Sequence, residues 1–358
     1  MNEETAKLIK LISENKTLNE ISNMMNLSKK QLFTRMFMLR NYGYLIDKKY
    51  YYNGDISYYL TNPFTNEKPL TIHTPSDMKN IRMILTSDSH FGNVKEDLEC
   101  TDKIFDYCTK ENISLIFHLG DFFEGVTRDS IKKQKYNSVQ EQIKATLNNY
   151  PFSDNILTIT LLGNHDASFW LDAGMDIKTI LENKRHDIIP IGYGQEIVNL
   201  SGCRFVLKHP IERCKVNSKN YNPNMEKIIF HGHSHRFKLI SEKDKLNIFV
   251  PSSSSISIQE NPNFLGTGIP SIIDAEFIIE SNKITSGIFK HYILLNNQLI
   301  KVGEHVTVNN IQLNPNLGET KKEIKPNFLT CFDFDDKEKN ITSQVKEIPK
   351  VRTKTIDK

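Results

Sequence analysis

Short stretches rich in aspartate, histidine and asparagine recur along the middle of the chain, each at or just after an apolar segment. Four have distinctive spacing: Asp88-Ser89-His90, Gly120-Asp121, Gly163-Asn164-His165-Asp166 and Gly232-His233-Ser234-His235. A fifth, His209-Pro210, follows the apolar run that ends at Lys208. Carboxylate, imidazole and carboxamide groups without a thiolate suit a divalent cation such as Mn²⁺, Fe²⁺ or Zn²⁺. An aspartate placed between two such ligand sets can bridge two ions.

The segments that carry these stretches have the pattern of an α/β sheet. Short apolar runs typical of buried strands cover residues 81–85, 113–117 and 156–162. Helical periodicity covers residues 94–111, 138–149 and 169–183, and hairpin patterns follow beyond residue 190. Alternating strands and helices indicate an α/β core, in which sites form at the carboxyl ends of the strands.

The five stretches, in this order, resemble the motifs of the calcineurin-like metallophosphoesterase superfamily over residues 81–260. The resemblance implies an αββα sandwich, which we assign to residues 81–310. It implies one metal held by Asp88, His90, Asp121 and His235, and a second held by Asp121, Asn164, His209 and His233. It also implies that His165 lies over the scissile phosphate and that Asp166 orients it.

The chemistry that the resemblance implies follows from charge. Two divalent ions would be the cofactors, with Mn²⁺ expected and Fe²⁺ or Zn²⁺ as alternatives. Such ions lower the pKa of bound water, and they also neutralise the phosphate oxygens. A protonated His165 would donate to the departing alkoxide as a general acid. We therefore expect a metal-dependent phosphoesterase.

The substrate is less well determined, because the superfamily includes protein phosphatases, purple acid phosphatases, cyclic-nucleotide phosphodiesterases and repair nucleases. The residues around Gly120-Asp121 and Gly163-Asn164 are most similar to the nuclease and small bacterial phosphodiesterase branches, including uncharacterised enzymes of bacteria and their phages. We expect hydrolysis of a phosphodiester in nucleic acid. Two alternatives stay open: a DNA-binding regulator with a sensory or structural metal domain, and a phosphatase or phosphodiesterase of a small nucleotide.

Residues 1–60 have the pattern of three helices followed by a hairpin. Thr17 with Glu20 and Ser28 with Gln31 match the capping box, and Asn53-Gly54 is a strong hairpin signal. This order resembles a winged helix-turn-helix domain, whose third helix enters the major groove of DNA. The resemblance implies that DNA is contacted by Lys29, Lys30, Gln31, Thr34, Arg35, Lys48 and Lys49. The alternative is a docking or dimerisation module, since nine Lys/Arg against six Asp/Glu is a mild excess.

Two polar segments flank the predicted catalytic domain. Residues 61–80 are punctuated by proline and are expected to form a linker. Residues 311–358 are polar and charged without a sustained period, and we expect a disordered tail there. Within the domain, His118 is expected to be a hydrogen-bonded core residue, whereas His231 either orients a metal ligand or caps a strand.

Composition excludes several classes of protein. The chain has 46 Lys/Arg against 43 Asp/Glu, so its net charge of +3 does not fit a nucleic-acid coat protein. No apolar run reaches the roughly 18 residues of a membrane span, and the first residues are acidic where a signal peptide is basic. The five cysteines form no C-x-x-C pair, which argues against a disulfide framework or a zinc ribbon. We therefore expect a cytoplasmic protein.

Overall fold

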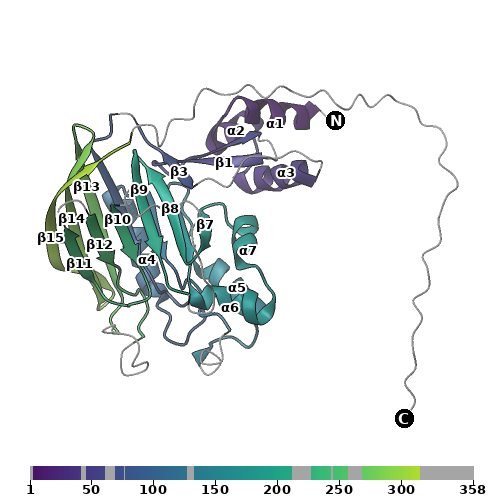
Figure 1. Cartoon of the computed structure of the whole chain (residues 1–358). Coiled ribbons are helices and arrows are strands. Elements are labelled where there is room, and N and C mark those ends of the chain that lie inside the picture. Colours follow the sequence, from purple (N-terminus) through teal and green to yellow (C-terminus); the bar gives the residue numbers. More distant parts are fainter. Residues whose placement is uncertain are drawn as a thin grey trace, which may run out of the picture. The chain divides into compact units, whose positions relative to one another are not determined.

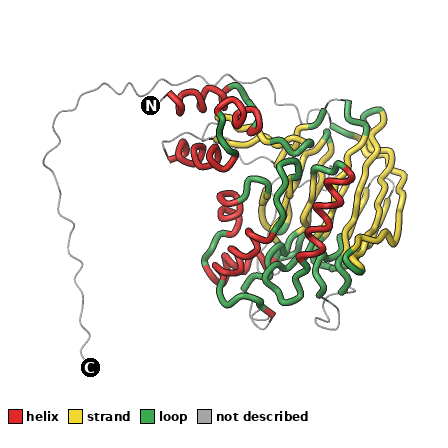
Figure 2. The backbone as a smooth tube through the Cα atoms, turned by 180° about the vertical axis from the view of Figure 1, so that it is seen from behind, coloured by secondary structure: helices red, strands yellow, loops and turns green. Residues whose placement is uncertain are grey.

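The computed structural model of the chain describes residues 3–41, 46–60, 69–75, 77–126, 133–211, 227–242, 245–256 and 268–314. Two β-sheets pack face to face, helices cover the outer face of one of them, and three N-terminal helices pack at one end (Figures 1 and 2). This mixed α/β architecture with paired sheets confirms the predicted fold class.

The first sheet has seven strands in the order β15-β14-β13-β4-β5-β6-β7. Strands β4 to β7 are parallel, and β13 to β15 add an antiparallel edge. The strands are β4 (Asn80–Thr86), β5 (Leu115–Leu119), β6 (Leu157–Leu162), β7 (Ile188–Tyr193), β13 (Ser271–Glu280), β14 (Lys283–Leu295) and β15 (Gln298–Gln312). The three predicted apolar strands are thus neighbours in the parallel part of one sheet.

Four helices cover the outer face of this sheet: α4 (Leu98–Glu111), α5 (Val139–Asn149), α6 (Asn164–Ala173) and α7 (Ile177–Lys184). The single helix predicted over 169–183 is wrong in two respects. It starts earlier, because Asp166 accepts the Gly163 amide at the first turn, and it is broken at Gly174, whose φ of 65° is left-handed. The Gly163-Asn164 motif is therefore the start of a helix.

The second sheet has eight strands in the order β11-β12-β10-β9-β8-β3-β1-β2. They are β1 (Ile46–Tyr51), β2 (Ile56–Leu60), β3 (Leu70–His73), β8 (Gln195–Leu200), β9 (Cys203–Lys208), β10 (Ile228–His231), β11 (Lys238–Glu242) and β12 (Lys245–Phe249). Buried aromatic rings join the two sheets, with Phe117 6.3 Å from Phe205 and Phe230 6.4 Å from Phe277 between centroids. Among the described residues, a small buried cluster on the outer face of this sheet consists of three strand side chains, Ile197, Val206 and Ile229.

The N-terminal module has the predicted order of three helices and a hairpin. Its helices are α1 (Glu3–Ser13), α2 (Leu18–Met25) and α3 (Lys29–Asn41), and the hairpin is formed by β1 and β2. Both capping boxes are present: Thr17 exchanges hydrogen bonds with Glu20, and Ser28 exchanges them with Gln31. Gly54 has the positive φ of 83° that the hairpin turn requires.

The structure differs from the linker expected over residues 61–80. Leu70–His73 form strand β3, which pairs in parallel with β1 on one side and with β8 on the other. The alternation of Leu70 and Ile72 with Thr71 and His73 is the period-two pattern of a strand, and Ile72 is buried. The N-terminal hairpin consequently continues the second sheet of the α/β domain.

The expected disordered tail lies, from residue 315 onward, outside the described residues. Residues 311–314 are part of the fold, because β15 extends to Gln312 and the Asn314 amide donates to the Gly202 carbonyl. None of the described helices is both long enough and apolar enough to cross a membrane.

Candidate metal centre

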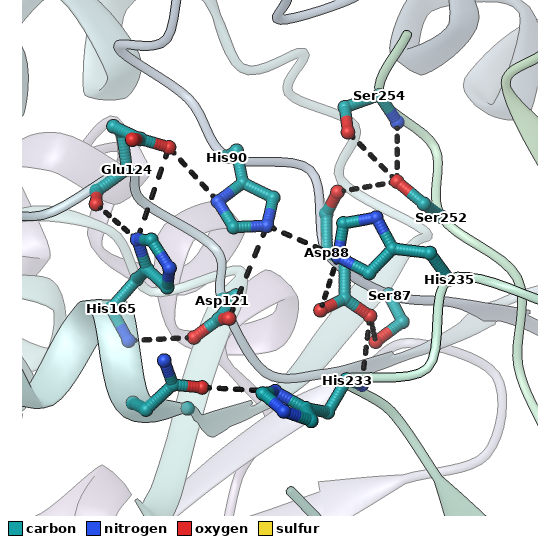
Figure 3. Close-up of polar contacts among 12 residues, drawn as sticks. Ser87, Asp88, His90, Asp121, Glu124, His165, His233, His235, Ser252 and Ser254 are labelled. Atoms are coloured by element: carbon teal, nitrogen blue, oxygen red, sulfur yellow. Dashed lines mark hydrogen bonds and ion pairs between the residues drawn. The ribbon is translucent and has the colours of Figure 1, made fainter. Parts of the chain in front are cut away.

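The predicted ligands come from the ends of strands in both sheets. Asp88 follows β4, Asp121 follows β5 and Asn164 follows β6, all in the seven-stranded sheet. His209 follows β9 and His233 follows β10 in the eight-stranded sheet. The carboxyl ends of these strands meet, so residues far apart in sequence lie within one cluster, part of which is drawn in Figure 3.

The backbone at this cluster is unusual. Positive φ angles between 48° and 71°, which side chains other than glycine rarely adopt, occur at Asp88, His90, Asp121, His233 and His235. Such conformations cost free energy, and surrounding structure must enforce them. Their concentration at five predicted ligands indicates that the fold is built to present these side chains.

One group of ligands consists of Asp88, His90 and His235, all buried. The Oδ1 atom of Asp88 lies 3.3 Å from Nε2 of His235, and Nε2 of His90 lies 3.4 Å from the same nitrogen (Figure 3). Two imidazole nitrogens at this distance need a proton or a cation between them. The group contains three of the four residues predicted for the first metal, and the fourth is Asp121.

The second group consists of Asp121, His209 and His233, with Asn164 beside them. The Oδ2 atom of Asp121 lies 3.1 Å from Nε2 of His209 and 4.0 Å from Nε2 of His90, so this carboxylate faces both groups. The Oδ1 atom of Asn164 lies 3.1 Å from Nε2 of His209 and 3.1 Å from Nδ1 of His233. All seven predicted metal ligands are therefore brought together.

The residues present fit divalent cations. Oδ1 of Asp88 and Oδ2 of Asp121 are buried, and no described residue gives either a well-oriented hydrogen bond, although imidazole nitrogens approach to between 3.1 and 4.0 Å. The Nδ1 atom of His209 donates to the Leu119 carbonyl at 2.7 Å, and Nδ1 of His90 donates to Glu124 at 3.0 Å. These outer hydrogen bonds leave Nε2 of both rings for a metal.

The charges of this cluster are strongly coupled. Burial opposes ionisation of Asp121, but His209 and His165 hold the pKa of its carboxyl well below the usual range. Burial also opposes protonation of His209, yet Asp121 overcomes it and the pKa of His209 rises to about 9. Without a cation, the carboxylates thus keep a proton on the imidazole, and a divalent ion would take the place of that proton.

His165 is held by Glu124, which the prediction did not include. Its Nδ1 atom donates to the Glu124 carbonyl at 2.6 Å, and the Glu124 carboxylate lies 3.9 Å away (Figure 3). Burial would lower the pKa of His165, but Asp121 and Glu124 raise it above its ordinary value. Sequence reasoning missed Glu124, although an acidic residue three positions after Asp121 was an available signal.

Asp166 does not orient His165 as predicted. Its carboxylate accepts three backbone amides, those of Phe122, Phe123 and Gly163, at 2.8 to 3.1 Å. It therefore ties the loop after Asp121 to the first turn of α6. Burial and the nearby Asp121 raise the pKa of Asp166 to about 7, although the amides oppose the rise.

A run of serines after β12 supports Asp88, and sequence reasoning missed it. Ser252 donates to the Asp88 carbonyl at 2.8 Å, and Ser87 donates to the Asp88 carboxylate (Figure 3). His118 bonds Ser89 at 2.8 Å and is fully buried, as predicted for a core histidine. His231 bonds Asn247 and stacks on Phe249, which places it within the sheet.

Several predicted DNA contacts are engaged within the chain. Lys29 pairs with Asp154 of the α/β domain at 2.7 Å, and Arg35 pairs with Glu4 at 2.5 Å. The Nζ atom of Lys48 lies over the Phe33 ring.

The remaining predicted contacts are nearer to solvent. Lys49 is half-buried, with Nζ over the Tyr59 ring, and Gln31 is exposed but occupied in its capping box. Lys30 and Thr34 are exposed on α3.

Comparison with known proteins assigns the class that this fold and site define. The model of the calcineurin-like phosphoesterase superfamily domain matches residues 81–264, and the chain belongs to this superfamily. It is accordingly a metal-dependent phosphoesterase. No curated protein matches the chain.

Similar solved structures share little sequence. Vacuolar protein sorting 29 of Cryptosporidium parvum is 12% identical, covers 64% of this chain and 100% of its own, and has a TM-score of 0.37. A predicted phosphoesterase of Streptococcus pneumoniae TIGR4 is 16% identical over 64% and 99% of the two chains, at 0.33. GAP50, described as an anchor in the inner membrane complex of Plasmodium, is 14% identical over 66% and 90%, at 0.38.

Proposed function

We propose that this phosphoesterase hydrolyses phosphodiester bonds of nucleic acid with two divalent ions, for which Mn²⁺ is the expected metal. One observation carries the two-ion proposal: Asp121 lies between the two ligand groups, since its Oδ2 atom faces His209 of one at 3.1 Å and His90 of the other at 4.0 Å. A shared carboxylate is what a pair of ions a few ångströms apart requires.

The residues of the chain then have distinct tasks. When bound, the ions supply hydroxide at neutral pH and withdraw charge from the phosphate oxygens. The His165 amide donates to Oδ1 of Asp121 at 2.8 Å and so fixes the orientation of the shared carboxylate. His165 itself is held through Nδ1, which leaves Nε2 to donate a proton to the leaving alkoxide. Its raised pKa favours the protonated form that this task needs.

A nucleic-acid substrate is supported by the N-terminal module. Three helices followed by a hairpin is the order of winged helix-turn-helix domains, and Lys30 and Thr34 of α3 are exposed. Lys29 and Arg35 support it less, because both are in ion pairs within the chain.

A small-nucleotide substrate is the second candidate, and one observation favours it. The module contacts Arg82 and Asp154, which lie near the amino ends of β4 and β6, whereas the metal ligands follow the carboxyl ends of the same strands. Nucleic acid held by the module would therefore have to extend along the domain to reach the metals.

A panel of substrates with added Mn²⁺ tests the proposal. We expect hydrolysis of bis-p-nitrophenyl phosphate and of DNA, slower hydrolysis of p-nitrophenyl phosphate, and loss of all activity with EDTA. Faster hydrolysis of the monoester p-nitrophenyl phosphate would show that the enzyme is a phosphatase and not the proposed diesterase. Hydrolysis of cyclic nucleotides but not of single- or double-stranded DNA would support the small-nucleotide alternative, and Asp121→Asn serves as the inactive control.

A further inference from the structure

A groove of about 550 Å³ lies where the N-terminal helices meet the phosphoesterase domain. Residues of α2 and α3 line one side, among them Asn23 and Lys30, and Phe152, Asp154 and His186 line the other. None of these residues belongs to the metal centre, so the groove is a separate feature of the molecule.

Phe152 is the most unusual residue of this groove. Its side chain is 52% exposed, although it is a large aromatic residue. The ring is nevertheless held in place: the His186 ring lies 5.3 Å away at 70°, and the Arg185 guanidinium lies 5.8 Å from its centroid. Arg185 is itself fixed by Asp187 and by the Pro151 carbonyl. An exposed aromatic ring on a rigid support is a stacking platform for a planar ligand.

The groove is also positively charged. Its one lining carboxylate, Asp154, is paired with Lys29 at 2.7 Å, so these two charges offset each other. Lys30 is exposed next to Lys29 on the α3 side of the groove and supplies the remaining positive charge. The exposed amide of Asn23 can meet a sugar or a base edge, whereas Asn19 and Ser22 already donate to Asp55 and to the Leu27 carbonyl. An aromatic platform beside a cation is the combination that binds single-stranded nucleic acid.

We propose that this groove is a binding site for single-stranded nucleic acid, in which a base stacks on Phe152 and Lys30 contacts a backbone phosphate. The inference rests on the proposed nucleic-acid substrate and adds a second point of attachment. Strand β6 separates the groove from the metal centre, and its six residues span about 20 Å. Only a strand long enough to cover that distance can occupy both places.

Fluorescence anisotropy tests the site with the full chain and a fluorescein-labelled oligothymidylate of about 20 nucleotides, with EDTA present so that no cleavage occurs. Phe152→Ala should raise Kd about tenfold, because one stacking contact is lost. Phe152→Trp should retain binding. Lys30→Ala should reduce the slope of log K against log salt by about 0.7, one lost phosphate contact, whereas Lys10→Ala on α1 should not.

Hydrolysis of bis-p-nitrophenyl phosphate should be equal in both Phe152 variants and in Lys10→Ala, because neither position touches the metal centre. Unchanged oligonucleotide binding by both Phe152→Ala and Lys30→Ala would overturn the proposal. Inorganic polyphosphate added as a competitor gives a second test. If the same concentration displaces the oligonucleotide from the normal chain and from Phe152→Ala, stacking contributes nothing and the proposal is overturned. If binding depends on Phe152 but DNA is not cleaved, this site stands and the proposed substrate fails. If DNA is cleaved equally well by the normal chain, Phe152→Ala and Lys30→Ala, the proposed substrate stands and this site fails.

Discussion

At the residue scale, the two oxygens of Asp121 have separate surroundings. Oδ1 accepts the His165 amide at 2.8 Å, whereas Oδ2 faces imidazole nitrogens of both ligand groups. The first contact orients the carboxylate, and the second makes it available to two ions. An amide at this position would keep the size of the side chain but lose its negative charge.

Asp121→Asn should therefore bind fewer than two Mn²⁺ per chain and lose phosphodiester hydrolysis. The negative charge that attracts the cations is removed, while the packing around the residue is kept. Metal content by elemental analysis and initial rates with bis-p-nitrophenyl phosphate measure the two effects. A variant that retains full metal content and full activity would show that Asp121 is not shared.

The His165 side chain should affect catalysis without affecting metal content. Its ring bonds the Glu124 carbonyl, whereas its contact with the Asp121 carboxylate is made by the backbone amide, which alanine retains. His165→Ala is expected to keep both ions and to lower kcat by about 10²- to 10⁴-fold, the usual contribution of a positioned acid. The loss should be smaller for bis-p-nitrophenyl phosphate than for DNA, because p-nitrophenolate departs without a proton. Loss of metal in this variant would instead identify His165 as a ligand.

The clustering of the seven candidate metal ligands could be predicted from sequence because each lies in a short motif with a distinctive set of residue types. Glu124 and Asp166 could not be assigned their contacts in the same way. Glu124 holds His165 through its backbone carbonyl, which any residue possesses, and Asp166 accepts backbone amides of a loop more than 40 positions away. Contacts to the main chain leave little trace in residue type.

At the scale of elements, the start of α6 is where the motif acquires its geometry. The Asp166 carboxylate accepts the Gly163 amide at the helix start and the amides of Phe122 and Phe123 in the loop after Asp121. A side chain at Gly163 would collide with Asp121 and His209, so only glycine allows the helix to begin here.

Asp166→Ala should destabilise the fold, because three buried amides would lose their acceptor at a cost of about 1 kcal/mol or more each. A total of about 3 kcal/mol corresponds to a fall in Tm of about 6 to 12 °C for a domain of this size. Calorimetry of the metal-free chain measures it, and Asp172→Ala, an exposed position of the same helix, is the matched control. Equal Tm values in the two variants would contradict this role of Asp166.

The predicted strands of the parallel sheet were found because they are continuous apolar runs with both faces buried. Strand β3 was not, because it has four residues and lies within a polar, proline-containing segment. Its pairing with β1 and β8 depends on partners that are distant in sequence. The order of elements in residues 1–60 was predictable, whereas their attachment to the second sheet was not.

At the scale of the whole molecule, the metal centre joins the two sheets. Asp88, Asp121 and Asn164 come from one sheet, and His209 and His233 come from the other. A cation bound by both sets ties the carboxyl ends of the two sheets together. An unfolded chain offers no such arrangement, so the free energy of binding adds to the free energy of unfolding.

Bound metal should therefore raise Tm. At a free Mn²⁺ concentration of about 100 times Kd, one site contributes about 2.7 kcal/mol, which corresponds to about 5 to 10 °C. Differential scanning calorimetry with Mn²⁺ and with EDTA measures the difference. Asp121→Asn should lose most of it, because the shared carboxylate is the link between the two ligand groups, and Lys30→Ala should retain it in full. If Mn²⁺ left Tm unchanged in the normal chain, the cluster of carboxylates and imidazoles would have to be stabilised by protons alone, with His209 carrying the charge that the cation would otherwise supply.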